Sequence, residues 1–114
     1  MIYEGKLTVY NLKNTAEKGL MPQEKLVPVC EEFYGERTIG VTRQYAALGA
    51  DRRIDMLVRI WRNDDVTPGQ YVIPDDGHQY RIDLVQYNTD EDGLKVSDLT
   101  LIRLEDNYDV ADPL

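Results

Sequence analysis

The segment that decides the fold class is residues 54–61, with the sequence IDMLVRIW. Its even-numbered positions are apolar: Ile54, Met56, Val58 and Ile60. Asp55, Leu57, Arg59 and Trp61 separate them. A period of two places one set of side chains on one face of a β-strand. We therefore predict a strand here, with its even-numbered side chains in the core.

The chain after this strand predicts a β-hairpin. Residues 70–73 form a short strand-like run, and Asp75-Asp76-Gly77 is typical of a tight turn. In the return strand Tyr80, Ile82 and Leu84 alternate with polar residues, so we expect all three in the core.

Residues 96–104 are expected to form the last strand, although their apolar residues fall on both odd and even positions. Either a β-bulge or burial on both faces would explain that mixture. The acidic stretch 88–93 before it reads as a turn, and residues 106–114 read as an acidic tail.

The first half of the chain is less regular. Leu7 and Val9 alternate with polar residues and predict a first strand, followed by a polar loop over 11–18. Residues 23–27 lie between two prolines and fit a helical turn or a short strand equally well. We expect Val27, Val29 and Phe33 to dock on the core. Residues 38–43 predict a further strand, and residues 44–51 lose the alternation.

Together these segments predict a mainly β chain: a small antiparallel β-barrel or sandwich of about six strands with little helix. A length of 114 residues suits one compact domain. We assign residues 1–105 to it and residues 106–114 to the tail. A closed sheet would also remove exposed strand edges.

Composition limits the classes of partner. The chain carries 13 Lys and Arg against 21 Asp and Glu, a net charge of −8. Sequence-specific nucleic-acid binding and binding to acidic membranes both favour a basic surface, so neither is expected. No apolar run reaches membrane length, and the N-terminus lacks the pattern of a signal peptide. One cysteine, Cys30, cannot form an internal disulfide, which favours the cytoplasm or an assembled particle.

The charge is unevenly distributed along the chain. Residues 1–60 hold nine Lys/Arg and eight Asp/Glu, a sum of +1, whereas residues 61–114 hold four and thirteen, a sum of −9. Six arginines gather in the middle: Arg37, Arg43, Arg52, Arg53, Arg59 and Arg62. They form either a solvated face or an edge that meets an acidic edge of another copy.

Residues for catalysis are sparse, so we do not expect an enzyme. The one histidine, His78, follows a turn, and no local motif pairs it with Cys30. The carboxylates sit in turns, where solvation opposes the pKa tuning that acid–base chemistry needs.

One turn resembles a calcium loop in part. Asn88, Asp90, Asp92 and Gly93 match its first, third, fifth and sixth positions, but Leu99 stands where the bidentate Glu belongs. We predict an acidic hairpin turn, with no metal and no cofactor.

Two longer stretches resemble a family of tailed-phage and prophage proteins. They are YGERTIGVTRQYAALGADRRIDMLVRIWR (34–62) and QYVIPDDGHQYRIDLVQYNTDEDGLKVSDLTLIRLEDNYDV (70–110). Their layout is similar to that of the head-closure, or head–tail joining, proteins, also called connector or stopper proteins. That resemblance implies a small β-barrel that assembles with copies of itself into a ring below the portal, extends the DNA channel and docks the tail.

The resemblance also implies partners and a site. A portal or adaptor protein would lie above the ring and tail proteins below, with DNA passing through the channel. The chain would be found in the virion, or in the host cytoplasm during assembly. The segment 43–53 matches the family's channel loop. We expect it to carry assembly contacts, through Arg43, Gln44, Tyr45, Arg52 and Arg53.

A second hypothesis is an acidic DNA mimic that inhibits a DNA-binding enzyme. Mimics spread carboxylates along one face, whereas here they cluster in turns and arginines occupy the middle of the chain. Tight binding to a DNA-processing enzyme would favour it over the ring.

Overall fold

A computed structural model describes residues 5–14, 19, 23–37 and 54–111. The chain forms seven strands in one sheet. Their bounds are β1 Gly5–Asn14, β2 Glu24–Arg37, β3 Met56–Trp61, β4 Tyr71–Ile73, β5 Tyr80–Thr89, β6 Lys95–Arg103 and β7 Asp109–Val110. No helix occurs in these residues, which confirms the predicted mainly β class.

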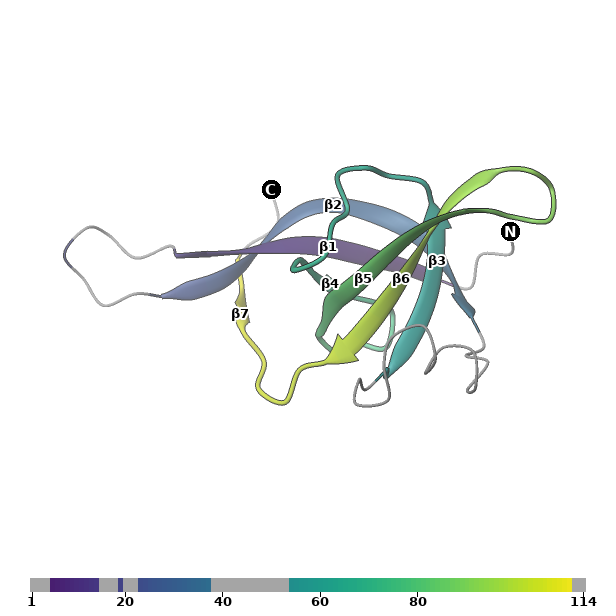
Figure 1. Ribbon diagram of the computed structural model, residues 1–114. Helices are drawn as coiled ribbons and strands as arrows, with labels where there is room; N and C mark the ends of the chain where they lie inside the picture. Colours follow the sequence, from purple (N-terminus) through teal and green to yellow (C-terminus); the bar gives the residue numbers. More distant parts are fainter. Residues whose placement is uncertain (1–4, 15–18, 20–22, 38–53, 112–114) are drawn as a thin grey trace.

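Six of the strands close into a ring. The order is β1-β4-β5-β6-β3-β2, and β2 pairs back with β1, so the sheet is an antiparallel barrel (Figure 1). The predicted turn joins β4 to β5: the Gly77 N–H donates to the Pro74 carbonyl at 3.1 Å, and Gly77 has a φ of 79°. A positive φ favours glycine at this position.

Apolar side chains from every strand of the ring fill the barrel. They are Leu7, Val9, Tyr34, Val58, Ile60, Val72, Tyr80, Ile82, Leu99 and Leu101, together with Val66 from the loop after β3. Val58 and Ile60 are fully buried, and Met56 packs against the cluster, as the alternation in β3 predicts. The filled interior leaves the outer surface and the projecting ends for contacts with other molecules.

The prediction that Leu84 lies in the core is wrong. The pairing of β5 with β6 shifts register between Ile82 and Leu84, where Asp83 is an extra residue. A bulge of this kind changes which parity faces inward. Val85 therefore packs against the core and Leu84 is only half-buried.

Strand β6 is buried on both faces. All residues from Val96 to Leu101 are buried, whereas the bulge lies in the neighbouring β5. Of the two explanations for its mixed pattern, burial on both faces is therefore the one that applies to β6 itself.

The hairpin of β1 and β2 is longer than the sequence indicated. β1 runs to Asn14, so residues 11–14 are strand rather than loop, and residues 24–27 open a strand of 14 residues rather than a helical turn. β4 pairs only with Thr8–Tyr10 of β1, and β3 only with Tyr34–Arg37 of β2. The far part of the hairpin consequently projects from one end of the barrel (Figure 1).

The end of the chain is attached to that hairpin. β7 pairs in parallel with Lys25 and Leu26 of β2, within the segment expected to be an acidic tail. The Gln79 side chain holds Tyr108, the residue before β7, by two hydrogen bonds. Its amide N–H donates to the Tyr108 carbonyl, and its amide oxygen accepts the Tyr108 N–H, each at 2.8 Å. The Tyr108 ring packs edge-on against Tyr71, with centroids 5.5 Å apart.

Candidate functional site

The five residues predicted to carry assembly contacts lie outside the described part of the chain. They are Arg43, Gln44, Tyr45, Arg52 and Arg53. The same holds for the strand expected over residues 38–43. The role of segment 43–53 therefore stays a prediction, and the site is built from the residues that the structure describes.

One arginine of the central cluster belongs to the sheet rather than to an interface. Arg59 on β3 and Asp98 on β6 are paired across the strands, and each is 7% exposed. Arg59 donates from Nε to Asp98 Oδ1 at 2.7 Å and from Nη2 to Oδ2 at 2.9 Å. Asn88 adds a third bond to Asp98 Oδ2 at 2.6 Å. Because its guanidinium is already bound on both arms, Arg59 is not available to another copy.

The surroundings lower the pKa of Asp98 and raise the pKa of Arg59, so both side chains are held in their charged forms. Burial acts to raise the pKa of Asp98, but the hydrogen bonds from Arg59 and Asn88 and the positive charge of Arg59 outweigh it and hold that pKa below its usual value. The hydrogen bond to Asp98 raises the pKa of Arg59. A bidentate pair of this kind is geometrically specific and charge-assisted.

Arg62, by contrast, lies on the surface. Its Nε contacts Asp64 Oδ1 at 3.1 Å, and its guanidinium stacks over the Tyr87 ring, 4.6 Å from the centroid. Arginine and tyrosine are residue types that often dominate binding energy at protein interfaces. The stacked pair is therefore a candidate contact on the β3 and β5 side of the barrel.

Exposed apolar side chains occur in two regions. On β2 and β7, the exposed fractions are 41% for Val29, 55% for Phe33 and 43% for Val110. On the β5–β6 hairpin, Tyr87 and Leu94 are each 48% exposed. The prediction that Val29 and Phe33 dock on the core is wrong. Val29 is the extra residue where the β1–β2 register shifts, and Phe33 is opposite Lys6, whose ammonium lies 5.8 Å from the ring centroid.

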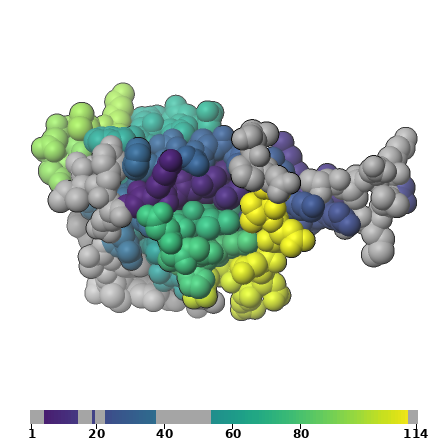
Figure 2. Space-filling model, turned by 180° about the vertical axis from the view of Figure 1, so that it is seen from behind, coloured from purple at the N-terminus to yellow at the C-terminus, as the bar shows by residue number. Residues whose placement is uncertain are grey.

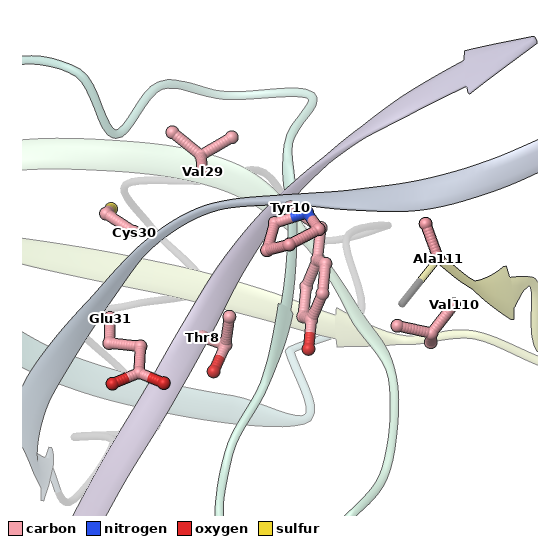
Figure 3. A pocket seen from close by; sticks show the side chains of 8 residues that line it. Thr8, Tyr10, Val29, Cys30, Glu31, Val110 and Ala111 are labelled. Atoms are coloured by element: carbon pink, nitrogen blue, oxygen red, sulfur yellow. The ribbon is translucent and has the colours of Figure 1, made fainter. Parts of the chain in front are cut away.

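A pocket of about 370 Å³ lies at the base of the projecting hairpin (Figure 3). Thr8 and Tyr10 come from β1, residues 28–31 from β2, Val110 from β7, and Ala111 directly follows β7. Figure 3 shows the Tyr10 and Thr8 side chains between Glu31 on one side and Val110 and Ala111 on the other. The Lys6 ammonium pairs with Glu31 at 2.6 Å, which neutralises the carboxylate at the rim. This mostly apolar hollow suits an apolar side chain of a partner.

Sequence reasoning missed the pocket and β7. The signal for the pocket was Pro28, since a proline inside a strand commonly marks a bulge or an edge. Nothing local signals β7, because two residues, Asp109 and Val110, carry no periodicity.

Cys30 and His78 have different neighbours. The Asn63 amide lies 3.8 Å from Cys30 Sγ, whereas His78 Nδ1 lies 3.0 Å from Arg103 Nη2. Burial, with the charges of Glu32 and Asp65, raises the pKa of the Cys30 thiol, which disfavours the thiolate that a nucleophile requires. Each of these side chains therefore contacts a different residue, and neither contact joins Cys30 to His78.

The acidic turn uses its ligand-like groups internally. Asp90 Oδ1 accepts the N–H groups of Asp92 at 3.0 Å and Leu94 at 2.8 Å, while the Asn88 amide is bound to Asp98. Gly93, with a φ of 81°, completes the turn. Within the described residues no group of three His, Cys, Asp or Glu side chains is placed to hold a metal ion.

The fold and its surface define a small closed antiparallel barrel with a projecting hairpin. A similar structure is the solution structure of protein SF1141 from Shigella flexneri 2a, with a TM-score of 0.61 and 17% sequence identity. The match covers 87% of this chain and 91% of that one, so the likeness extends over nearly the whole fold. No family model and no curated protein matches the sequence. No helix among the described residues is long and apolar enough to cross a membrane.

Proposed function

We propose that this chain is a structural connector protein of a tailed phage or prophage, which assembles into a ring below the portal and docks the tail. The observation that carries the proposal is the placement of exposed apolar side chains on projecting hairpins outside a filled barrel. Val29 and Val110 lie on one hairpin surface, and Tyr87 and Leu94 on another. Two different apolar surfaces on one chain are what a repeating contact between copies requires.

The interior supports a structural role. Leu99, Leu101 and Val72 are fully buried and contribute, with the other core residues, to a continuous apolar filling. The pocket, whose walls combine apolar residues with Thr8 and Glu31, lies outside the barrel, at the hairpin base, where another protein can reach it. The resemblance of residues 34–62 and 70–110 to head-closure proteins supplies the place of the ring in the particle.

The net charge of −8 fits this role as well. A net-negative protein around a DNA channel repels the phosphate backbone, so DNA would pass without adhering. Portal or adaptor proteins above and tail proteins below are the partners that this position implies.

The test is complementation of the phage or prophage that carries the gene. Deletion should give heads and tails that fail to join, and the full-length chain supplied in trans should restore the titre of infectious particles. A chain with Val58→Asp, which should not fold, is the negative control. An undiminished titre after deletion would refute the proposal. Tight binding of the pure protein to a DNA-processing enzyme would then favour the inhibitor hypothesis.

A further inference from the structure

The last strand of the chain lies against the barrel without being part of it. β7 pairs in parallel with residues 25–26 of β2, whereas every other strand pair among the described residues is antiparallel. Neither Asp109 nor Val110 belongs to the core cluster. Figure 2 shows the end of the chain, in yellow, on the surface beside the projecting hairpin. The barrel therefore keeps its core whether β7 comes from the same chain or from another copy.

The edge of β2 that receives β7 requires a strand. Leu26 is fully buried, and its cross-strand partner is Val110. The Ala111 N–H donates to the Leu26 carbonyl at 2.9 Å. Without a strand at this position, β2 would leave main-chain hydrogen-bonding groups unpaired and expose the apolar Leu26 side chain. Any copy of β7, from the same chain or from a neighbour, satisfies these groups equally well.

Few contacts hold β7 on its own chain. Asp109 and Val110 are exposed, and Tyr108 before them is half-buried. The attachment consists of the strand pairing, the two hydrogen bonds between Gln79 and Tyr108, and the ring contact of Tyr108 with Tyr71. Segments that bury little apolar surface open locally at a small fraction of the global free energy of unfolding. β7 can therefore leave β2 while the barrel stays folded.

The segment that joins β6 to β7 is short and has to bend back on itself. We call residues 105–107 the hinge; all three are exposed, and the chain bends at the first two, which are acidic. Both ends of the hinge are attached to Gln79: the Leu104 N–H donates to its carbonyl at 2.9 Å, and Tyr108 binds its side chain. Adjacent like charges favour an extended segment. Short hinges of this kind favour the exchange of a terminal element between copies.

We propose that copies of this chain exchange β7, so that β7 of one copy pairs with β2 of the next. Val110 then packs against Leu26 of the neighbouring copy, and Tyr108 binds the Gln79 side chain of that copy. Because the contacts are the same as within one chain, the two arrangements differ mainly in the hinge, which is bent in one and extended in the other. Each copy donates a strand at one place and receives one at another, so the contact repeats from copy to copy and can close into a ring.

The local concentration of copies decides which arrangement prevails. A short flexible link keeps a strand near its own binding edge at an effective concentration of roughly millimolar. Dilute chains are therefore closed monomers, and exchange prevails where copies are held side by side. The four residue steps from Leu104 to Tyr108 span at most about 14 Å, so only a copy in direct contact can receive the strand. The inference rests on the proposed function, because a connector ring holds its copies in this way.

Disulfide trapping of the full-length protein at about millimolar concentration detects the exchange. Lys25 and Asp109 are direct cross-strand partners, and paired strands lie about 4.8 Å apart, within the Cα separation of roughly 4.4–6.8 Å that a disulfide spans. In a Cys30→Ala background, a Lys25→Cys chain is mixed with an Asp109→Cys chain under mild oxidation. Mass spectrometry should find a dimer that joins the two different chains. Lys25→Cys mixed with Glu91→Cys is the control, because Glu91 is an exposed acidic residue in the turn between β5 and β6.

Two hinge variants test the exchange by sedimentation over a range of protein concentrations. Glu105→Pro with Asp106→Pro and Asn107→Pro gives a stiff, extended hinge that cannot bend back to Gln79. Because the closed monomer no longer competes, this variant should associate at concentrations about tenfold lower than wild type. Glu105→Gly with Asp106→Ser and Asn107→Gly removes the same two charges but keeps the hinge flexible, so it should associate no more strongly than wild type. Circular dichroism should show the wild-type spectrum for both.

The result separates the exchange from the proposed function. A dimer of the two different chains above the control, together with stronger association of the proline variant, supports the exchange whatever the phage experiment gives. The exchange is overturned if that dimer stays at the control level with both the wild-type and the proline hinge, or if the proline variant remains monomeric. Either of those results would leave the connector proposal standing, with a different contact between its copies.

Discussion

Removing the carboxylate of Asp98 should destabilise the barrel strongly. The Asp98→Asn substitution leaves the Arg59 guanidinium buried, with each side chain of the pair only 9% exposed in the wild type. Breaking such a buried pair at one partner typically costs about 3–5 kcal/mol. Because small domains are stable by about 5–15 kcal/mol, this loss would be a large share of the total.

The Arg59–Asp98 pair is expected to stabilise the barrel little more than two apolar side chains at the same positions would. Arg59→Met combined with Asp98→Val removes both charges and keeps a strand-favouring side chain on β6. Replacing both members of a buried pair is commonly neutral or stabilising, so the double variant should recover most of the stability lost in Asp98→Asn. Comparing Asp98→Asn with the double variant would separate the cost of burying an unpaired Arg59 charge from the attraction between Arg59 and Asp98.

Urea unfolding followed by circular dichroism measures both effects. The matched control is Asp64→Asn, which breaks the exposed Arg62–Asp64 pair, where side-chain exposures are 40% and 74%. That change should cost no more than about 1 kcal/mol. If Asp98→Asn costs as little as Asp64→Asn, or if the double variant is as unstable as the single one, the reasoning from burial is refuted.

Three further predictions follow from the structure, and a fourth from the sequence. Val58→Asp buries an unpaired charge and should unfold the domain. Leu84→Asp should lower the melting temperature much less, because the bulge at Asp83 places Leu84 outside the core. Equal effects of the two substitutions would contradict the register of β5 against β6. Thr100→Val should raise stability by about 1 kcal/mol, because the buried Thr100 hydroxyl has no hydrogen-bond partner among the described residues; a loss of stability in urea would show that it has one. Because folding lowers the pKa of Asp98, its ionised form stabilises the fold fully above the pKa of Asp in the unfolded chain, about 3.9, and this stabilisation is lost as pH falls through the lower folded value. The free energy of unfolding should therefore fall more steeply with acid pH for wild type than for Asp98→Asn. Arg52→Glu with Arg53→Glu should leave the circular dichroism spectrum intact but prevent complementation, and a normal titre would remove segment 43–53 from the assembly surface.

The fold could be predicted where one face of a strand packs on the core. In β3 the period-two pattern follows from Val58 and Ile60 facing inward, and the Asp75-Asp76-Gly77 turn has its own local chemistry. The pattern fails in β6, where polar and apolar residues are buried together, and at Asp83 of β5, an extra residue that changes the parity. Neither condition is visible in one strand, because each depends on the neighbour that it pairs with.

The projecting part of the β1–β2 hairpin was harder to predict for a related reason. Beyond the barrel, the described residues of β1 and β2 pair mainly with each other and with β7. No alternation of apolar and polar residues is therefore required there. Val29, which the sequence places near the core, is exposed because the bulge inserts it without a cross-strand partner. The sequence also gives no sign that Lys25 lies between Lys13 of β1 and Asp109 of β7, because only the registers of the two strand pairs place them there. Residues that pack in the core therefore leave a periodic pattern in the sequence, and residues on the projecting hairpin do not.

The division between core and ends also bears on how such a chain can associate without losing its fold. The barrel closes through main-chain pairing, and its filling uses side chains from all six strands of the ring. Lys13, Lys25, Glu91 and Asp92 lie outside that filling, so their charges can be reversed with little effect on the core. A charge reversal at such a surface residue that blocks complementation while the melting temperature holds would therefore indicate a lost contact with another molecule and not a lost fold. By the same argument, Val58→Asp should block complementation by unfolding the barrel, and circular dichroism tells the two cases apart.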